Sequence, residues 1–130
     1  MIQKRIKERN SRGFTLIELL VVIAIIGVLS SVVLASLNSA RGKGSDAKVK
    51  AQLSSARGSA EIYYSNQNPP SYTGMCAAAA GDPSGIQQYL DGGNYPDSVA
   101  PSCGASATAY AIWRTLPFAG GNWCVDSAGA

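Results

Sequence analysis

The sequence contains no histidine, and this absence removes several kinds of catalytic site at once. Serine and cysteine nucleophiles are commonly activated by a neighbouring histidine, so triads and dyads of that type are excluded. Cysteine is also sparse, because the chain has three cysteines, none in a Cys-x-x-Cys pair. Without histidine they would make a poor zinc site. The sequence therefore points away from an enzyme and predicts no cofactor.

Lysine, arginine and aspartate are absent from residues 14–37, where the one charged residue is Glu18. The uncharged residues 19–37 would form a helix of roughly 28 Å, close to the thickness of a bilayer's hydrocarbon core. Five basic residues precede this run and would hold the N-terminus in the cytoplasm by the positive-inside rule: Lys4, Arg5, Lys7, Arg9 and Arg12. The pattern predicts one membrane span followed by an exported C-terminal part.

Glu18 lies at the edge of this apolar span and needs an explanation. An acidic group at mid-bilayer costs about 2.5–3.5 kcal/mol, and less near the end of a span. No cation lies in the span to pair with it, but cleavage between Gly13 and Phe14 would create a positive α-amino group four residues before Glu18. The alternative is an interfacial glutamate that turns its carboxylate to water.

The sequence from Gly13 and Phe14 through Glu18 into the apolar run resembles the N-terminal signature of type IV pilins and of the related pseudopilins of type II secretion. The resemblance implies that a prepilin peptidase removes residues 1–13 as a leader and methylates Phe14. It also implies that Glu18 meets the N-terminal amine of a neighbouring subunit. Many pilins have a helix-breaking proline near Ala35, and this chain has none there. Any local melting of the helix would then rely on Gly27 and residues 30–31.

Two other targeting interpretations fit the sequence less well. The apolar run is too long for an ordinary cleaved signal peptide, and residues 38–40 offer a poor cleavage site. A plain single-span anchor fits the hydropathy but leaves Gly13, Phe14 and Glu18 unexplained.

The part that follows the span predicts a second helical stretch. Residues 38–44 contain two glycines and predict a soft joint outside the membrane, at which the helix kinks or is briefly interrupted while the stretches on both sides form one long helix. Ser45 or Asp46 can cap a helix that ends near Asn66, before two prolines. Its apolar residues recur at steps of three and four and form one face: Val49, Leu53, Ala56, Ala60 and Tyr63. This stripe requires a cover.

Residues 67–130 are expected to supply that cover as a small globular domain. The best strand candidate is residues 107–116, with Tyr110, Ile112 and Arg114 on one face. Residues 118–121 predict a turn, residues 123–126 a returning strand, and residues 83–90 a short helix. The predicted fold class is α+β, with a long N-terminal helix packed against a small antiparallel hairpin.

The three cysteines would lie in an oxidising compartment if the chain is exported, which favours one disulfide and one leftover thiol. With a turn near Gly120, Cys124 lies opposite Thr115 or a close neighbour. Cys103 is then more than about 7 Å further along, too far for a disulfide. We therefore expect Cys76 to pair with Cys103, and Cys124 to be free or paired between chains.

The charges of the chain argue against a nucleic-acid partner. The formal net charge is +3, but residues 14–130 hold six basic and seven acidic residues. A local basic patch near the helix is expected to be a solvated face or a subunit contact: Arg41, Lys43, Lys48, Lys50 and Arg57. Four loop aspartates could ligate Ca2+, as major pseudopilins do in a C-terminal loop, but their spacing favours solvated carboxylates: Asp82, Asp91, Asp97 and Asp126.

The resemblance implies a structural subunit, held in the cytoplasmic membrane with its N-terminus inside. Prepilin peptidase would process it, and an assembly platform with ATPase machinery would polymerise it into a helical homo-oligomer outside the membrane. One alternative is a major pseudopilin, whose short periplasmic filament drives secretion. The other is an anchored binding module that never polymerises.

Overall fold

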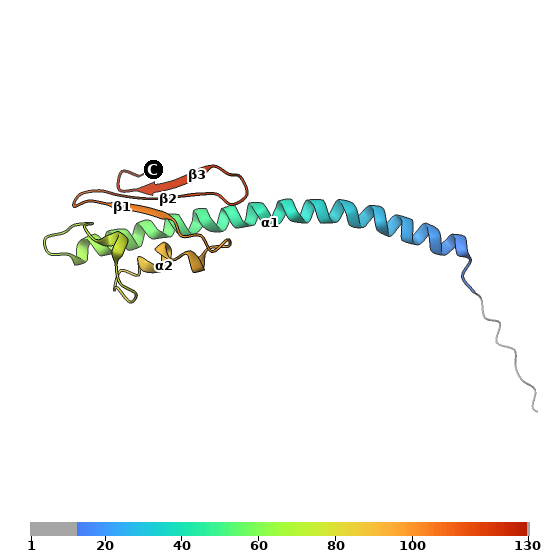
Figure 1. The fold of residues 1–130 in the computed structure, drawn as a ribbon, viewed down its shortest axis with the longest axis horizontal. Helices are drawn as coiled ribbons and strands as arrows, with labels where there is room; N and C mark the ends of the chain where they lie inside the picture. The colour runs from blue at the N-terminus through green and yellow to red at the C-terminus, as the bar shows by residue number, and fades with distance from the viewer. Residues whose placement is uncertain (1–12, 130) are drawn as a thin grey trace, which may run out of the picture. The chain divides into compact units, whose positions relative to one another are not determined.

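A computed structural model describes residues 13–129, and the chain divides into two compact units between Leu37 and Asn38. Helix α1, Leu16–Asn66, contributes residues to both units (Figure 1). The basic residues 4–12 and most of the expected leader lie outside the described residues.

The first unit consists, in its described part, of residues 13–15 and the apolar start of α1. The most apolar 18-residue window of this helix has a mean hydropathy of 2.8, and none of it is buried within the chain. By length and composition the helix can cross a membrane.

Residues 38–44, which the sequence predicted as a soft joint, are helical throughout. The glycine at position 42 has a packing reason instead. A Cβ atom added there would lie 2.2 Å from Cδ2 of Phe118, so the absence of a side chain lets the Phe118 ring approach the helix. Helix α1 ends at Asn66, close to the predicted position.

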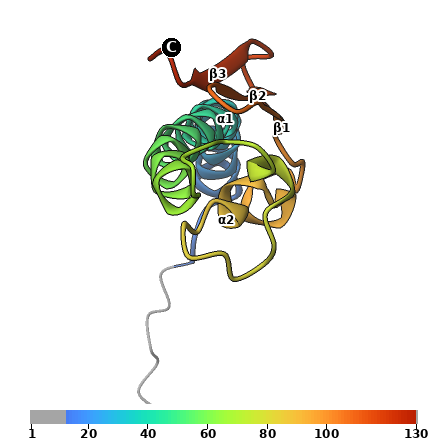
Figure 2. The same ribbon diagram turned by 90° about the vertical axis from the view of Figure 1, so that its left-hand side faces the viewer.

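The second unit is built around the predicted stripe of α1. All five residues of the stripe are buried, which confirms the predicted face, and Asp46 is buried beside them. A three-stranded antiparallel sheet of order β1-β2-β3 and the segment containing α2 lie on different sides of this half of the helix (Figures 1 and 2). The core is completed by buried residues from the sheet and from the segment between α1 and the sheet: Tyr72, Met75, Ile86, Tyr95, Tyr110, Ile112, Leu116 and Val125. The predicted α+β class is confirmed.

The sheet contains the predicted hairpin and one strand that was not predicted. Strand β2, Tyr110–Thr115, pairs with β3, Asn122–Asp126. Tyr110, Ile112 and Arg114 are buried on the same face of β2, as predicted. Strand β1, Ser102–Ala105, pairs with the other edge of β2. Its four residues are small and include a glycine, so they carry little intrinsic strand preference, and pairing with β2 defines the strand.

The helix expected at residues 83–90 is shorter in the structure. Helix α2 spans Gln87–Leu90, and the residues before it form a turn in which Gly85 has a φ of 68°. This left-handed conformation is incompatible with an α-helix and suits glycine. Two short 3-10 helices flank α2 in the chain, η1 at Met75–Ala77 and η2 at Gly92–Asn94.

Candidate functional site

The start of α1 is closed by a reciprocal pair of hydrogen bonds between Thr15 and Glu18. Glu18 Oε2 accepts from the backbone N–H of Thr15 at 2.8 Å and from its hydroxyl at 2.9 Å. The Thr15 hydroxyl oxygen accepts from the backbone N–H of Glu18 at 3.2 Å. This is a capping box, in which residues three apart satisfy two backbone donors that the helix leaves unpaired. Sequence reasoning missed the role of Thr15, although Thr-x-x-Glu before an apolar run is its usual signal.

The peptide bond between Gly13 and Phe14 lies immediately outside this cap. Residues 13–15 are not helical, and the Phe14 side chain is 89% exposed. A Cβ atom at Gly13 would meet no atom within 4 Å. The predicted cleavage point is thus open backbone next to a capped helix end.

The apolar residues that follow the cap are exposed along the whole first unit. Their large side chains, from Leu16 to Leu37, have exposed fractions between 44% and 74%. A continuous apolar surface of this length is unusual on a soluble monomer and requires lipid or protein to cover it.

Comparison with known proteins gives this segment a family. The profile of the prokaryotic N-terminal methylation motif matches residues 9–34, which include Gly13, Phe14 and Glu18. The chain is also 47% identical over 70 residues to a Thermus thermophilus protein named type IV wide pilus major component PilA4. About half of this chain is thus similar to a type IV pilin. The match covers 54% of the chain and 52% of that pilin, so the chain spans about half the length of the relative it matches. No solved structure is significantly similar to the chain.

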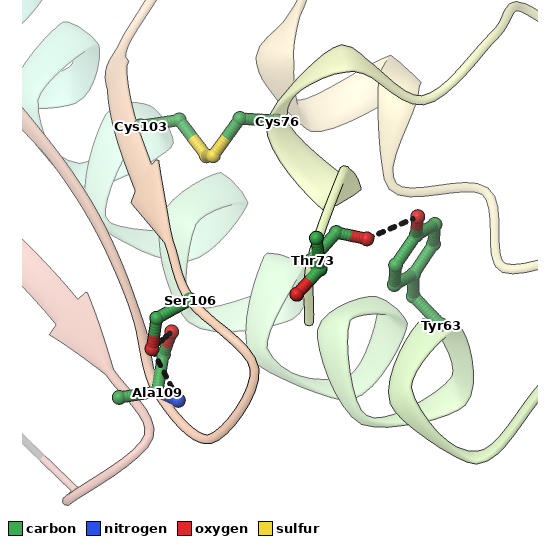
Figure 3. The surroundings of a disulfide bond; sticks show 6 residues. All are labelled: Tyr63, Thr73, Cys76, Cys103, Ser106 and Ala109. Carbon is green, nitrogen blue, oxygen red and sulfur yellow. Dashed lines mark hydrogen bonds between the residues drawn. A yellow bond between two sulfur atoms is a disulfide. The ribbon is translucent and has the colours of Figure 1, made fainter. Parts of the chain in front are cut away.

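The second unit contains a disulfide between Cys76 and Cys103, the pair favoured from the sequence (Figure 3). Their Cα atoms are 5.7 Å apart, and the bond joins η1 to β1. Cys124 is exposed and has a free thiol. It lies opposite Trp113, two residues from the expected partner.

The reason why Cys103 cannot reach Cys124 differs from the one that the sequence suggested. Cys103 does not lie further along the same hairpin; it lies on β1, and Cys124 lies on β3, across the central strand β2. Two strand spacings separate them, about 9.6 Å, beyond the Cα distance that a disulfide spans. The expected pairing of Cys76 with Cys103 is therefore confirmed. The distance between Cys103 and Cys124, however, arises across the sheet and not along the hairpin.

Asp46 has a structural role that the sequence did not reveal. Instead of capping a second helix, its buried carboxylate accepts hydrogen bonds from the backbone N–H groups of Phe118 and Ala119, both at 2.9 Å. Both N–H groups belong to the turn between β2 and β3, where neither strand offers them a hydrogen-bond partner. Asp46 therefore fixes the end of the hairpin to α1, and no local sequence pattern predicts a contact between residues 72 positions apart.

The four aspartates considered for calcium are engaged separately. Three accept hydrogen bonds from nearby residues of their own loops, and the fourth pairs with an arginine: Asp82 with Ser84, Asp91 with Gly93, Asp126 with Ala128 and Gly129, and Asp97 with Arg114. Within residues 13–129, no three potential metal-ligating side chains come together. The site geometry therefore gives no support to a calcium centre among the described residues.

The pair of Asp97 and Arg114 connects the loop before β1 to the end of β2. The Arg114 side chain is 3% exposed, and its guanidinium lies 4.6 Å from the centre of the Tyr95 ring. The hydrogen bond from Arg114 lowers the pKa of Asp97, and burial raises the pKa of Tyr95. The buried face of β2 therefore ends with Arg114, which forms an ion pair with Asp97.

The five residues of the basic patch on α1 have different surroundings. Lys50 lies over the ring of Trp123 at 4.7 Å, and Arg57 is close enough to Tyr110 to influence the pKa of its phenol. Arg41, Lys43 and Lys48 are exposed to solvent. These three residues are therefore solvated, as expected for part of the patch.

Proposed function

We propose that the chain is a structural subunit of a type IV pilus-like filament, held in the cytoplasmic membrane before assembly and polymerised through the first half of α1. The observation that carries this proposal is the exposed apolar helix headed by the methylation motif at residues 9–34. The similarity to a protein named as a major pilus component supports it. In a filament, the helices of neighbouring subunits would cover the apolar surface that lipid covers beforehand.

Processing would occur at the junction of residues 13 and 14. We propose that prepilin peptidase removes residues 1–13, that Phe14 becomes the N-methylated first residue, and that residues 38–130 remain outside. Support comes from the open backbone at Gly13 and Phe14, next to the capped helix start. After cleavage, the new amine would lie one residue before Thr15.

Glu18 would serve both its own helix and a neighbouring subunit. Glu18 Oε2 accepts both hydrogen bonds that Thr15 donates. Among the described residues, Oε1 therefore remains able to accept a hydrogen bond from another donor. The α-amino group of Phe14 from an adjoining subunit would bind there. In an apolar filament core, this pair would keep the carboxylate and the amine from being buried without partners, which is costly for either charge.

Intact-mass measurement on sheared surface filaments tests this proposal. The expected mass is that of residues 14–130 with one disulfide and one added methyl group. An unmethylated but assembled subunit would overturn the methylation alone. Assembled filaments whose subunit retains residues 1–13 would overturn the processing step, and absence of this chain from any filament would overturn the filament role.

A further inference from the structure

A cavity in the second unit has no role in filament assembly as proposed above. Its volume is about 670 Å³, within the range of roughly 300–1,000 Å³ that is usual for small-ligand sites. It lies between the loop that precedes β1 and the last residues of β2, and the turn between β2 and β3 closes one end.

The cavity exists because the β1-β2 ladder stops early. The last pair is Ser102 with Trp113, and the same register would next bring Ala100 opposite Thr115. The ladder ends at Ser102, and the chain before it leaves the sheet at Pro101. Ala100 and Thr115 both line the cavity.

The backbone of Thr115 contributes polar groups to this space. On β2, Tyr110 and Leu116 make their backbone hydrogen bonds with residues on the β3 side. Because successive residues of a strand alternate in direction, Thr115 directs its N–H and C=O to the β1 side. The β1 strand has ended there, so these two groups have no strand partner.

The side chains of the lining combine one aromatic ring with neutral hydrogen-bonding groups. Trp113 is 40% exposed, and a Cβ atom on Gly104 would lie 3.7 Å from its Cζ3, so its ring lies across β1. The Thr115 hydroxyl donates to Asn122 Oδ1 at 2.9 Å. This bond fixes the Asn122 amide and leaves its Nδ2 to donate elsewhere. Ser102 adds a hydroxyl.

The charge of the lining is balanced within the chain. Arg114 is the one basic residue that lines the cavity, and Asp97 is the one acidic residue. They form an ion pair with each other. A nucleic acid or an acidic ligand would have to compete with Asp97 for the Arg114 guanidinium, and a wholly apolar ligand would leave the polar groups unpaired.

We propose that this cavity binds the terminal sugar of a neutral glycan. A neutral sugar has apolar C–H surfaces that pack on an indole ring, and hydroxyl groups that suit the Asn122 amide, the Ser102 hydroxyl and the Thr115 backbone. It carries no charge that the paired Arg114 and Asp97 would have to meet. The site belongs to the second unit alone and does not depend on whether the chain polymerises.

Saturation-transfer NMR on the full-length protein tests this site, with methyl glycosides of glucose, galactose, mannose and N-acetylglucosamine as probes. The micelles must be of a detergent without a sugar headgroup, because maltoside and glucoside detergents would compete. We expect saturable binding of at least one glycoside with a dissociation constant on the order of 1 mM. Glucuronate and acetyl-tetra-alanine amide, an acidic sugar and a neutral peptide, are the comparison probes.

Two variants and one matched control assign the binding to the cavity. Trp113→Ala should weaken it about tenfold, and Asn122→Ala, a change of an exposed side chain, should weaken it severalfold. Trp123→Ala is the control, because Trp123 is 37% exposed but lies outside the cavity against Lys50, and it should leave binding unchanged. The proposal is overturned if no glycoside binds at about 50 mM, if Trp113→Ala and Asn122→Ala both leave binding intact, or if the peptide or glucuronate binds and the neutral glycosides do not.

Discussion

The ring of Phe118 lies so close to Gly42 of α1 that a side chain at position 42 would require the ring to move. An added Cβ atom would be 2.2–2.7 Å from three atoms of the ring. One helical turn further along, Asp46 binds the backbone of the same turn through Phe118 and Ala119. The hairpin end is therefore held to the helix by a close packing contact and by two charge-assisted hydrogen bonds.

Substitution of Gly42 and of Gly44, two of the glycines of α1, should have opposite effects on stability. Gly44→Ala should stabilise the second unit by up to about 1 kcal/mol, because alanine is the better helix former and no atom lies within 4 Å of the new Cβ. Gly42→Ala should destabilise it by about 1–3 kcal/mol, because the Phe118 ring must move away. Thermal unfolding followed by tryptophan near-ultraviolet circular dichroism measures both.

The double variant Gly42→Ala/Phe118→Ala is the control for this pair. With the ring removed, the alanine at position 42 should no longer carry a penalty relative to Phe118→Ala alone. If Gly42→Ala stabilises the protein as much as Gly44→Ala does, the close contact is not a feature of the folded protein.

The disulfide should contribute to stability, and the free cysteine should not. Replacing both Cys76 and Cys103 with serine should cost about 3 kcal/mol, because the bond restricts a loop between residues 27 positions apart in the unfolded chain. Cys124→Ser is the matched control and should change stability little, since Cys124 is exposed. Non-reducing peptide mapping should recover Cys76 linked to Cys103, and a peptide joining Cys103 to Cys124 would contradict the sheet order.

The ion pair of Asp97 and Arg114 should make stability depend on acid pH. The Arg114 hydrogen bond lowers the pKa of Asp97 in the folded protein, whereas an unfolded aspartate titrates near pH 3.9. The stability from this pair is therefore present above about pH 4 and is lost as the pH falls through the lower folded pKa. Comparison of the wild type with Asp97→Asn between pH 7 and pH 2.5 isolates it from other carboxylates.

Asp97→Asn should be the less stable protein at pH 7, because it leaves the buried Arg114 without its anionic partner. The difference between the two proteins should shrink below about pH 4. A difference that stays constant down to pH 2.5 would show that the pair does not titrate as described.

Local pattern explains how much of this fold the sequence could predict. The stripe from Val49 to Tyr63 has a helical period, and the β2-β3 hairpin has alternating residues around a glycine turn, so both were predictable. Strand β1 and the Asp46 contact depend on partners distant in sequence, which local propensity does not report. Residues 38–44 were predicted as a joint within one long helix because glycine usually weakens helices. The long helix is confirmed, and it continues through these residues without interruption.

The start of α1 likewise contains residues that the sequence identified and one that it did not. Gly13, Phe14 and Glu18 were identified because a carboxylate beside an apolar span needs a reason. Thr15 was overlooked, and its capping box gives Glu18 a second reason that requires no other subunit. The two roles of Glu18 can be separated because glutamine also completes a capping box but carries no charge.

Filament yield from cells that express only Glu18→Gln tests the proposed assembly most directly. The variant should retain the bonds with Thr15, insert into the membrane and be cleaved after Gly13, because a neutral side chain makes the span less costly to insert. It should nevertheless form no filaments, since the amine of Phe14 would be buried without an anionic partner, at about 3–5 kcal/mol per contact by analogy with buried ion pairs. Electron microscopy and immunoblotting of sheared material should show processed subunit in the membrane and none in filaments. Normal filaments built from Glu18→Gln alone would contradict the charge pairing and leave Glu18 as a helix cap.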